Sequence, residues 1–284
     1  VFNENEHIYI EEGRHPFVER RLKNFVPNDL GLSKDDYNIM VITGPNMAGK
    51  STYMRQVALI AIMAQLGSYV PAKKAELPVF DRIFTRIGTS DFLASGKSTF
   101  MVEMIETANI LRGLTTKSLI VLDEVGRGTS TFDGMSIAEA LLEYLADKNE
   151  KPYVLFSTHY HELTELAKKK KNIKNFTIPA QEWKDDIIFS HKVIEGVANK
   201  SYGIYVAKLA GLPDKLINRA KEILTNLEKA DIKGYRDNIL PFKKQPTLFE
   251  DKEKRIIEEI ESINLEEITP LQAFDILRKL KNML

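Results

Sequence analysis

A glycine-rich segment near position 45 has the residue types and the spacing of a phosphate-binding loop. It reads Gly44-Pro45-Asn46-Met47-Ala48-Gly49-Lys50-Ser51 and fits the pattern G-x-x-x-x-G-K-[S/T]. In such a loop the backbone N–H groups surround the phosphates, the lysine reaches the β- and γ-phosphates, and the serine hydroxyl binds Mg²⁺. The segment therefore predicts that the chain binds a nucleoside triphosphate together with Mg²⁺.

Two adjacent acids supply the next part of the chemistry. Asp123 and Glu124 follow the apolar run Ser118–Leu122, and an acid at the carboxyl end of a neighbouring strand is where an NTPase holds its Mg²⁺. We expect Ser51 and Asp123 to hold the metal, and Glu124 to orient or deprotonate the attacking water. Paired acids also occur in plain surface turns, but the phosphate loop favours the catalytic interpretation.

Polar residues also follow a third apolar run. Ser157, Thr158 and His159 come directly after Pro152–Phe156, and open α/β sheets bind their ligands at the carboxyl ends of their strands. We therefore expect His159 to contact the γ-phosphate. His161 lies two residues further on, which leaves a metal site formed by the two histidines as an alternative.

A layered α/β fold would position these residues. Three short runs are apolar throughout, which is typical of parallel strands buried on both faces, namely Ile39–Ile42, Ser118–Leu122 and Pro152–Phe156. Helical patterns separate the runs, at Lys50–Leu66 and at Ile137–Leu145. The first helix would place the positive end of its dipole beneath the phosphates. Alternating strands and helices predict an α/β fold with a mainly parallel sheet.

Composition and charge narrow the possible functions. The chain has 284 residues, of which 43% are apolar and none is cysteine; this excludes disulfides and thiolate metal sites and makes a cytoplasmic location the default. Lys and Arg number 40 and so do Asp and Glu, so the chain lacks the positive excess that grips DNA phosphates. The lysine run Lys168–Lys171 is interpreted as a solvated loop, with a DNA-phosphate contact as the alternative.

Two further features bear on where the chain belongs. The longest apolar stretch, Val57–Leu66, falls well short of the roughly 20 residues that span a bilayer. The chain opens at Val1 without a methionine, and its first residues are neither basic nor apolar as in a signal peptide. We therefore expect a fragment of a longer protein.

The pattern becomes helical after Gly211. Apolar residues recur at helical spacing from Leu216 to Leu227, a polar stretch with Pro241 and Pro246 follows, and two amphipathic helices close the chain. We expect a P-loop ATPase domain at 1–210, a helix-turn-helix dimerisation clasp at 211–230, a polar linker at 231–252 and a two-helix oligomerisation region at 253–284. The alternative for the last two helices is that they fold back on the main domain.

Four motifs occur in a fixed order, at Thr43–Thr52, Ser98–Met104, Asp123–Gly134 and Ser157–Tyr160. Together they resemble the ATPase domain of the MutS family of DNA mismatch-recognition proteins. The resemblance runs from about His7 to the C-terminus, and Thr269–Ala273 is similar to the C-terminal helices of bacterial members.

The resemblance implies an ABC-type P-loop ATPase that works as a homodimer. Each ATP would lie between the phosphate loop of one subunit and the signature motif of the other, so Ser98 would act across the interface. From the residues alone, Ser98 is a plausible helix N-cap. The resemblance also assigns Thr52 to the nucleotide-binding loop, and Phe25 and His191 to the adenine ring. It implies a MutL-like repair partner, and mismatched DNA held mainly by domains absent from this chain.

We therefore predict an ATP-hydrolysing dimerisation fragment that switches the DNA-bound state of the protein and signals repair. One alternative is a dimerisation module with little intrinsic ATPase activity. Another ABC-type ATPase is a second alternative, although Ser98–Met101 lacks the Leu-Ser-Gly-Gly pattern of transporters. A third takes Ile204–Leu224 as a DNA-reading helix-turn-helix, but its second helix is largely apolar, which favours a clasp.

A short segment in the linker suggests one more partner. Gln245-Pro246-Thr247-Leu248-Phe249 resembles the peptide by which bacterial repair proteins dock on the DNA sliding clamp, with Pro246 where leucine is commoner. Two apolar side chains in a pocket and the hydrogen bonds of the glutamine would give weak binding. The alternative is that Leu248 and Phe249 pack against the helix at Ile256–Ile263.

Overall fold

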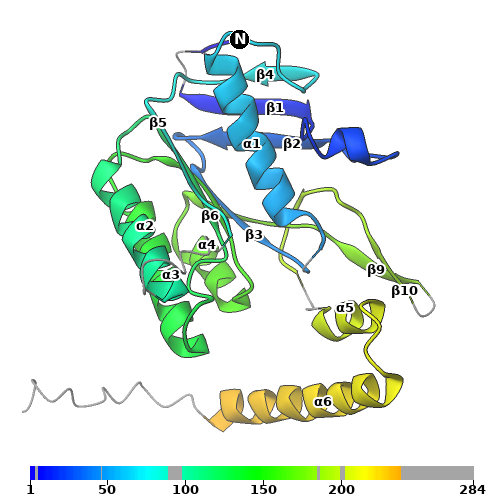
Figure 1. Cartoon of the computed structure of the whole chain (residues 1–284). Helices are drawn as coiled ribbons and strands as arrows, with labels where there is room; N and C mark the ends of the chain where they lie inside the picture. Colours follow the sequence, from blue (N-terminus) through cyan, green and yellow to red (C-terminus); the bar gives the residue numbers. More distant parts are fainter. Residues whose placement is uncertain (4–5, 46, 89–97, 184–185, 199–201, 238–284) are drawn as a thin grey trace, which may run out of the picture. The chain divides into compact units, whose positions relative to one another are not determined.

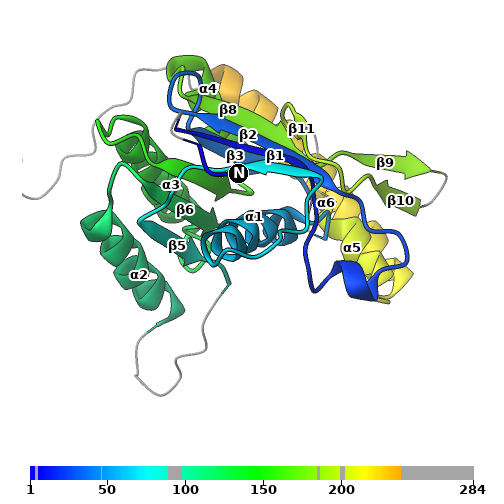
Figure 2. The same cartoon turned by 90° about the horizontal axis from the view of Figure 1, so that it is seen from above.

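The computed structural model describes residues 1–3, 6–45, 47–88, 98–183, 186–198 and 202–237. The chain divides into two compact units, residues 1–217 and 218–284. The first unit holds every element from β1 to α5 and the start of α6. Figures 1 and 2 show these elements from two directions.

A six-stranded mixed sheet forms the centre of the first unit. Its order is β11-β8-β3-β7-β6-β5, with bounds β3 (Ile39–Thr43), β5 (Arg82–Arg86), β6 (Ser118–Asp123), β7 (Tyr153–Ser157), β8 (Ile173–Thr177) and β11 (Ile194–Glu195). The strands from β8 to β5 are parallel to one another, and β11 is antiparallel to β8. The three strands predicted from their apolar runs are therefore confirmed, and the fold is α/β.

Alternate residues of these strands face two separate cores. On one face, α1 (Lys50–Gln65) packs with a set that includes Met40, Ile42 and Leu155. On the other face, α3 (Thr131–Ala146) and α2 (Thr99–Gly113) pack with a set that includes Val41 and Phe156. The strands are apolar throughout because both faces are covered. Figure 2 shows α1 on one side of the sheet and α3 on the other.

A second, antiparallel sheet covers part of the α1 core. Its order is β2-β1-β4, with β1 (His7–Gly13), β2 (Asn28–Ser33) and β4 (Lys74–Glu76). Its buried side chains alternate, as Ile8 and Ile10 do in β1. We predicted no strand before residue 38, although this period of two was a readable signal. Between β1 and β2 lies the 3₁₀ helix η1 (Glu19–Arg21).

The remaining elements follow β7 and β8. They are η3 (His161–Glu165), α4 (Leu166–Lys169), the hairpin of β9 (Ala180–Trp183) and β10 (Asp186–Phe189), α5 (Gly203–Leu209) and α6 (Asp214–Asp237). None of the helices in the described ranges combines the length and the apolar character that crossing a bilayer requires.

Two expected boundaries in the helical region differ from the structure. We placed the helix-turn-helix at 211–230, but its first helix, α5, begins at Gly203, because apolar residues before Gly211 already continue the helical pattern. We predicted that the linker begins at 231, but α6 continues to Asp237. Between residue 231 and Pro241 no proline occurs, and the single Gly234 does not end the helix. The rest of the linker, the segment Gln245–Phe249 and the two helices expected at 253–284 lie outside the described residues.

Two glycines bring α3 against the loop that follows β6. Gly126 has φ +89°, a left-handed conformation that favours glycine. An ideal Cβ on Gly134 would lie 2.1 Å from the carbonyl oxygen of Gly126 and 2.5 Å from Tyr160 Oη. The loop and the first turn of α3 therefore touch backbone to backbone.

We expect Gly134→Ala to destabilise the fold. The added methyl group must displace the backbone of Gly126, a clash that places the cost in the upper part of the range of about 1–3 kcal/mol, above the gain in helix propensity of roughly 1 kcal/mol. The free energy of unfolding in urea measures the effect. Gly203→Ala is the matched control, because it is also helical and an added Cβ meets nothing within 4 Å. Equal unfolding free energies for the two variants would contradict the prediction.

Candidate functional site

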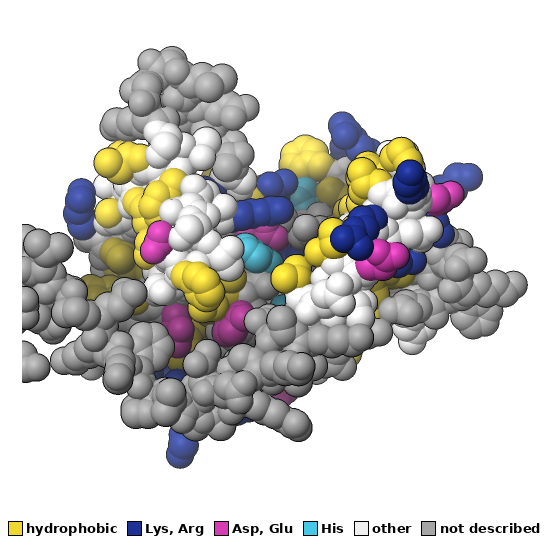
Figure 3. Space-filling model, turned by 90° about the horizontal axis from the view of Figure 1, so that it is seen from below, with side chains coloured by type: hydrophobic (Ala, Val, Ile, Leu, Met, Phe, Trp, Pro, Cys, Tyr) yellow, Lys and Arg dark blue, Asp and Glu magenta, His cyan; other side chains and the backbone are white. Residues whose placement is uncertain are grey.

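The ends of three neighbouring strands meet at one edge of the sheet. Ile42 of β3 and Asp123 of β6 both pair with Ser157 of β7. Just beyond this level, the Thr158 N–H donates to the carbonyl of Ile42 at 3.1 Å, and the Glu124 N–H donates to the carbonyl of Ser157 at 3.1 Å. The three predicted motifs therefore leave the sheet side by side. Figure 3 views this side of the molecule, where acidic, basic and histidine side chains gather near the centre.

Lys50 begins α1, and its side chain turns back into the phosphate-binding loop. Its ammonium donates to the carbonyl oxygens of Gly44 at 2.7 Å and Pro45 at 3.2 Å. The side chain is buried, and this burial lowers the pKa of Lys50. Gly49, at the N-cap, has φ +107°. A buried cation at a helix N-terminus suits an anionic ligand such as a phosphate. Asn46 lies outside the described residues.

The two predicted metal ligands lie on adjoining elements. Ser51 is in the first turn of α1, and Asp123 ends β6, where Ser157 Oγ donates to its carboxylate. Among the described residues, no group of three or more His, Cys, Asp or Glu side chains could hold a metal ion. A magnesium ion commonly takes one or two protein ligands and completes its shell with phosphate oxygens and water. The pair Ser51 and Asp123 fits that mode of binding.

Glu124 adopts an uncommon backbone conformation directly after β6. Its φ is +53°, and its N–H is shared between the carbonyl and the hydroxyl oxygen of Ser157. Its carboxylate lies 3.9 Å from the Lys50 ammonium and forms an ion pair with Arg127. Strained conformations of this kind persist where the surrounding structure fixes them, and they cluster at active sites. The carboxylate is thus aimed at the phosphate-binding loop.

His159 follows β7 beside Glu124. Its ring packs on Tyr160 with centroids 4.1 Å apart. Although the residue is largely exposed, burial of the ring is the main cause that lowers the pKa of His159, while the Glu124 carboxylate raises it. The structure does not support the alternative of a metal site formed by His159 and His161. In the described part of the chain no metal-binding group forms around His161, whose buried Nδ1 has no hydrogen-bond partner.

Ser98 caps the helix of the signature motif. Its Oγ accepts a hydrogen bond from the Met101 N–H at 3.1 Å, which confirms that it is an N-cap. The residue is exposed, and it does not line the pocket of about 370 Å³ in which Thr99 and Glu103 of α2 meet Asp123 and Glu124. Its neighbour Thr99 reaches this pocket, and Ser98 itself stays at the exposed start of α2.

A buried network that we did not predict ties α2 to the loop after Glu124. Glu103, 3% exposed, accepts a hydrogen bond from the Gly126 N–H at 2.7 Å and lies 3.5 Å from the buried Arg86 guanidinium. Gly126 is also held at its carbonyl, which accepts a hydrogen bond from Tyr160 Oη at 3.1 Å. The sequence signal was that Glu103 is the one acid in the apolar stretch Met101–Ile105. We treated it as part of the family motif and did not predict that it would be buried.

Phe25 and His191, the two residues assigned to adenine by resemblance, line a common pocket of about 220 Å³. The phosphate-binding loop and α1 complete it through Met47, Ala48, Gly49 and Thr52. His191 Nδ1 lies 2.9 Å from the carbonyl oxygen of Ala48, so this nitrogen carries the proton. We call this cavity beside the loop the base pocket, after the role that the resemblance assigns to Phe25 and His191.

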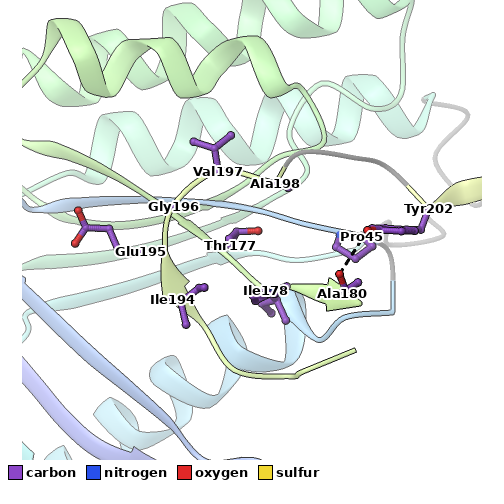
Figure 4. A pocket seen from close by; sticks show the side chains of 11 residues that line it. Pro45, Thr177, Ile178, Ala180, Ile194, Glu195, Gly196, Val197, Ala198 and Tyr202 are labelled. Atoms are coloured by element: carbon purple, nitrogen blue, oxygen red, sulfur yellow. Dashed lines mark hydrogen bonds between the residues drawn. The ribbon is translucent and has the colours of Figure 1, made fainter. Parts of the chain in front are cut away.

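A second pocket, of about 500 Å³, lies beyond Pro45 (Figure 4). It is lined by the end of β8, by β11 and by Tyr202, whose Oη lies 3.5 Å from the carbonyl oxygen of Ala180. Glu195 supplies its acidic side chain, and Pro45 is the predicted site residue that reaches it. Lys50 lines neither pocket: its neighbour Gly49 lines the base pocket, and Pro45, whose carbonyl accepts from the Lys50 ammonium, lines this one.

The family is decided by comparison with known proteins. The family model for MutS domain V matches residues 40–228. The chain belongs to the MutS family of DNA mismatch repair proteins. This confirms the resemblance that the four motifs indicated.

Three relatives show how far the similarity extends. Each carries the name DNA mismatch repair protein MutS: the chain is 54% identical to that of Thermodesulfovibrio yellowstonii, 53% to that of Caldicellulosiruptor saccharolyticus and 50% to that of Clostridium tetani. The matches cover 97–99% of this chain but 33–34% of the relatives. The chain therefore spans about a third of the length of these MutS proteins.

We expect the pKa of His159 to lie below its ordinary value of 6.5 and to fall further in Glu124→Gln. Burial disfavours the charged ring, and the substitution removes the carboxylate that favours it. NMR titration of the ring signals, assigned with His159→Gln, measures both values. Glu19→Gln removes a carboxylate that pairs with Arg14 instead, and it should leave the pKa of His159 in place. A higher pKa in Glu124→Gln than in the parent would contradict this.

Proposed function

We propose that the chain is the ATP-binding and ATP-hydrolysing part of a MutS protein, built as an ABC-type P-loop ATPase. The observation that carries the proposal is the meeting of Lys50 and Glu124, 3.9 Å apart, at the edge where β3, β6 and β7 end. Family membership and the base pocket beside the loop support it. ATP hydrolysis would switch the DNA-bound state of the longer protein.

Each residue would have a distinct role. Lys50 and the loop N–H groups would hold the phosphates, Ser51 and Asp123 would hold Mg²⁺, and His159 would donate toward the γ-phosphate. The metal ion, when bound, would neutralise charge on the phosphate oxygens. Phe25 and His191 would enclose the adenine ring.

Glu124 is the residue that we propose as the base. Its carboxylate lies 3.9 Å from the Lys50 ammonium and pairs with Arg127, which places it beside the loop that would hold the phosphates. Because Arg127 is largely exposed on the surface, its pairing with Glu124 can be exchanged for other contacts. Glu124 would then be free to orient water and accept its proton.

We propose that Ser98 completes the site of a partner subunit in a homodimer. Ser98 is exposed, and so are Met101 in the next turn of α2 and Phe132 at the start of α3. Exposed apolar side chains beside a polar helix N-terminus suit an interface.

A dimerisation module with little ATPase activity is the second candidate. It is favoured by α6, on which Ile223, Leu224 and Leu227 are exposed at helical spacing. The two candidates differ in turnover and agree in assembly, so single-turnover hydrolysis separates them.

The partners of the whole protein are proposals as well. We propose that a MutL-like repair protein reads the ATP state, that the DNA sliding clamp binds Gln245–Phe249, and that mismatched DNA is held mainly outside this chain. The names of the relatives support the repair context.

We expect Lys50→Ala to abolish ATP binding and Glu124→Ala to retain binding while hydrolysis stops. The lysine supplies charge to the phosphates, whereas the glutamate acts only on water. Isothermal titration calorimetry with ATP·Mg²⁺ and single-turnover hydrolysis measure the two properties, and on the order of 10²-fold or more loss of turnover is expected for Glu124→Ala. Equal loss of binding in both variants would refute the roles.

The proposed action of Ser98 in trans can be tested by mixing two inactive chains. In a mixed dimer of Ser98→Ala and Lys50→Ala chains, the intact phosphate loop of one chain faces the intact Ser98 of the other. We expect the mixture to regain the activity of one composite site, measured as phosphate release. Dimers that form without any recovery of activity would show that Ser98 does not act in trans.

A further inference from the structure

The base pocket is built from segments that are far apart in the sequence. Phe25 comes from the segment before β2, and His191 comes from the segment between β10 and β11. Neither segment pairs with the other as neighbouring strands of a sheet. Something else must fix the separation between the two rings.

The side-chain amide of Asn28 connects these segments. Its Nδ2 donates to the carbonyl of Val26 at 3.2 Å and to the carbonyl of His191 at 2.9 Å, and its Oδ1 accepts from the Val193 N–H at 2.7 Å. Both donor hydrogens are therefore used. Asn28 is 5% exposed and itself lines the pocket. A buried amide with all these bonds is rigid.

His191 is held from two sides. Its carbonyl accepts from Asn28, and its ring nitrogen Nδ1 lies 2.9 Å from the carbonyl oxygen of Ala48 in the phosphate-binding loop. Its φ of +52° is left-handed and costly for a residue with a Cβ. Without the bond from Asn28, the strained backbone of His191 would relax, and its ring would move away from Phe25.

We propose that Asn28 is a positioning residue that sets the separation of Phe25 and His191, and so provides the affinity for the base of the nucleotide. This inference rests on the proposed ATP-binding function. The binding energy of the nucleotide would then have two separate parts, one from the phosphates and one from the base. The loop and Lys50 hold the phosphates whether or not Asn28 is intact, whereas the base contact depends on Asn28.

The substitution Asn28→Asp tests this with almost no change of shape. A carboxylate can still accept from the Val193 N–H, but it has no hydrogen for the carbonyls of Val26 and His191 and repels both. We expect the Kd of ATP·Mg²⁺ to rise about tenfold or more and the Kd of tripolyphosphate·Mg²⁺ to stay within about twofold. The kcat at saturating ATP should stay within about twofold, because only binding of the base is affected.

A matched control separates positioning from general destabilisation. Asn172 also donates from Nδ2 to two groups, Asn38 Oδ1 at 3.2 Å and the carbonyl of Ala146 at 3.0 Å. It lies just before β8, at the opposite end of the sheet from the site. Asn172→Asp should lower the unfolding temperature and leave the affinities for ATP and tripolyphosphate unchanged. Asn28→Ala removes both Nδ2 bonds without the repulsion, and also the acceptor for the Val193 N–H, and it should show the same selectivity.

The outcomes are distinct. A loss of affinity for ATP but not for tripolyphosphate in Asn28→Asp and Asn28→Ala supports the inference. Equal losses for both ligands, or the same loss of ATP affinity in Asn172→Asp, would show a merely structural role and overturn it. Unchanged ATP affinity in both Asn28 variants would also overturn it. A parent chain that binds neither ligand would refute the proposed function, and the inference with it.

Discussion

The parallel pairing of β3, β7 and β6 is the constraint on which the site depends. Because Ile42 and Asp123 both pair with Ser157, the phosphate-binding loop, Thr158 and Glu124 leave the sheet at one level. A slip of one residue would exchange the side chains that fill the two cores. A slip of two would keep the faces but move Glu124 about 6–7 Å along the strand, out of reach of the loop. Core packing therefore fixes the geometry of the site.

Beyond the sheet edge, side chains replace strand pairing in holding the backbone. Glu103 accepts the N–H of Gly126, Tyr160 donates to its carbonyl, and Gly134 packs against it. A residue whose N–H and carbonyl are both hydrogen-bonded, and whose backbone packs against a neighbouring helix, has little freedom to move. Glu124 lies two residues earlier, and its left-handed φ is held between this fixed point and the end of β6. The same logic applies to the base pocket, where a buried amide takes the place of a strand pair.

The local parts of the site were predictable, and the long-range parts were not. The phosphate-binding loop and the acids after β6 are short patterns whose residue types and spacing indicate a single kind of site. The apolar run before each of them predicted the strands β3 and β6. Glu103 and Asn28 acquire their roles from partners 23 and 163 residues away, and no spacing in the sequence encodes such pairs. The antiparallel β1 was missed although its alternation of Ile8 and Ile10 is local, because we took only runs that are apolar throughout as strands.

The exposed lysines after η3 and the buried Lys50 differ in how their charges are paired. In the lysine-rich stretch, three ammonium groups pair with acids: Lys168 with Glu165, Lys170 with Asp147 and Lys174 with Asp36. Such exposed pairs add little stability, but each carboxylate offsets the potential that would attract a DNA backbone, which favours a solvated surface over a DNA contact. The expected loop is in part a helix, because Lys168 and Lys169 are the last residues of α4. The buried ammonium of Lys50 instead hydrogen-bonds carbonyl oxygens of its own loop, with Glu124 at 3.9 Å. Because burial strengthens electrostatic attraction, this ammonium would attract an anionic ligand in the loop more strongly than an exposed lysine would.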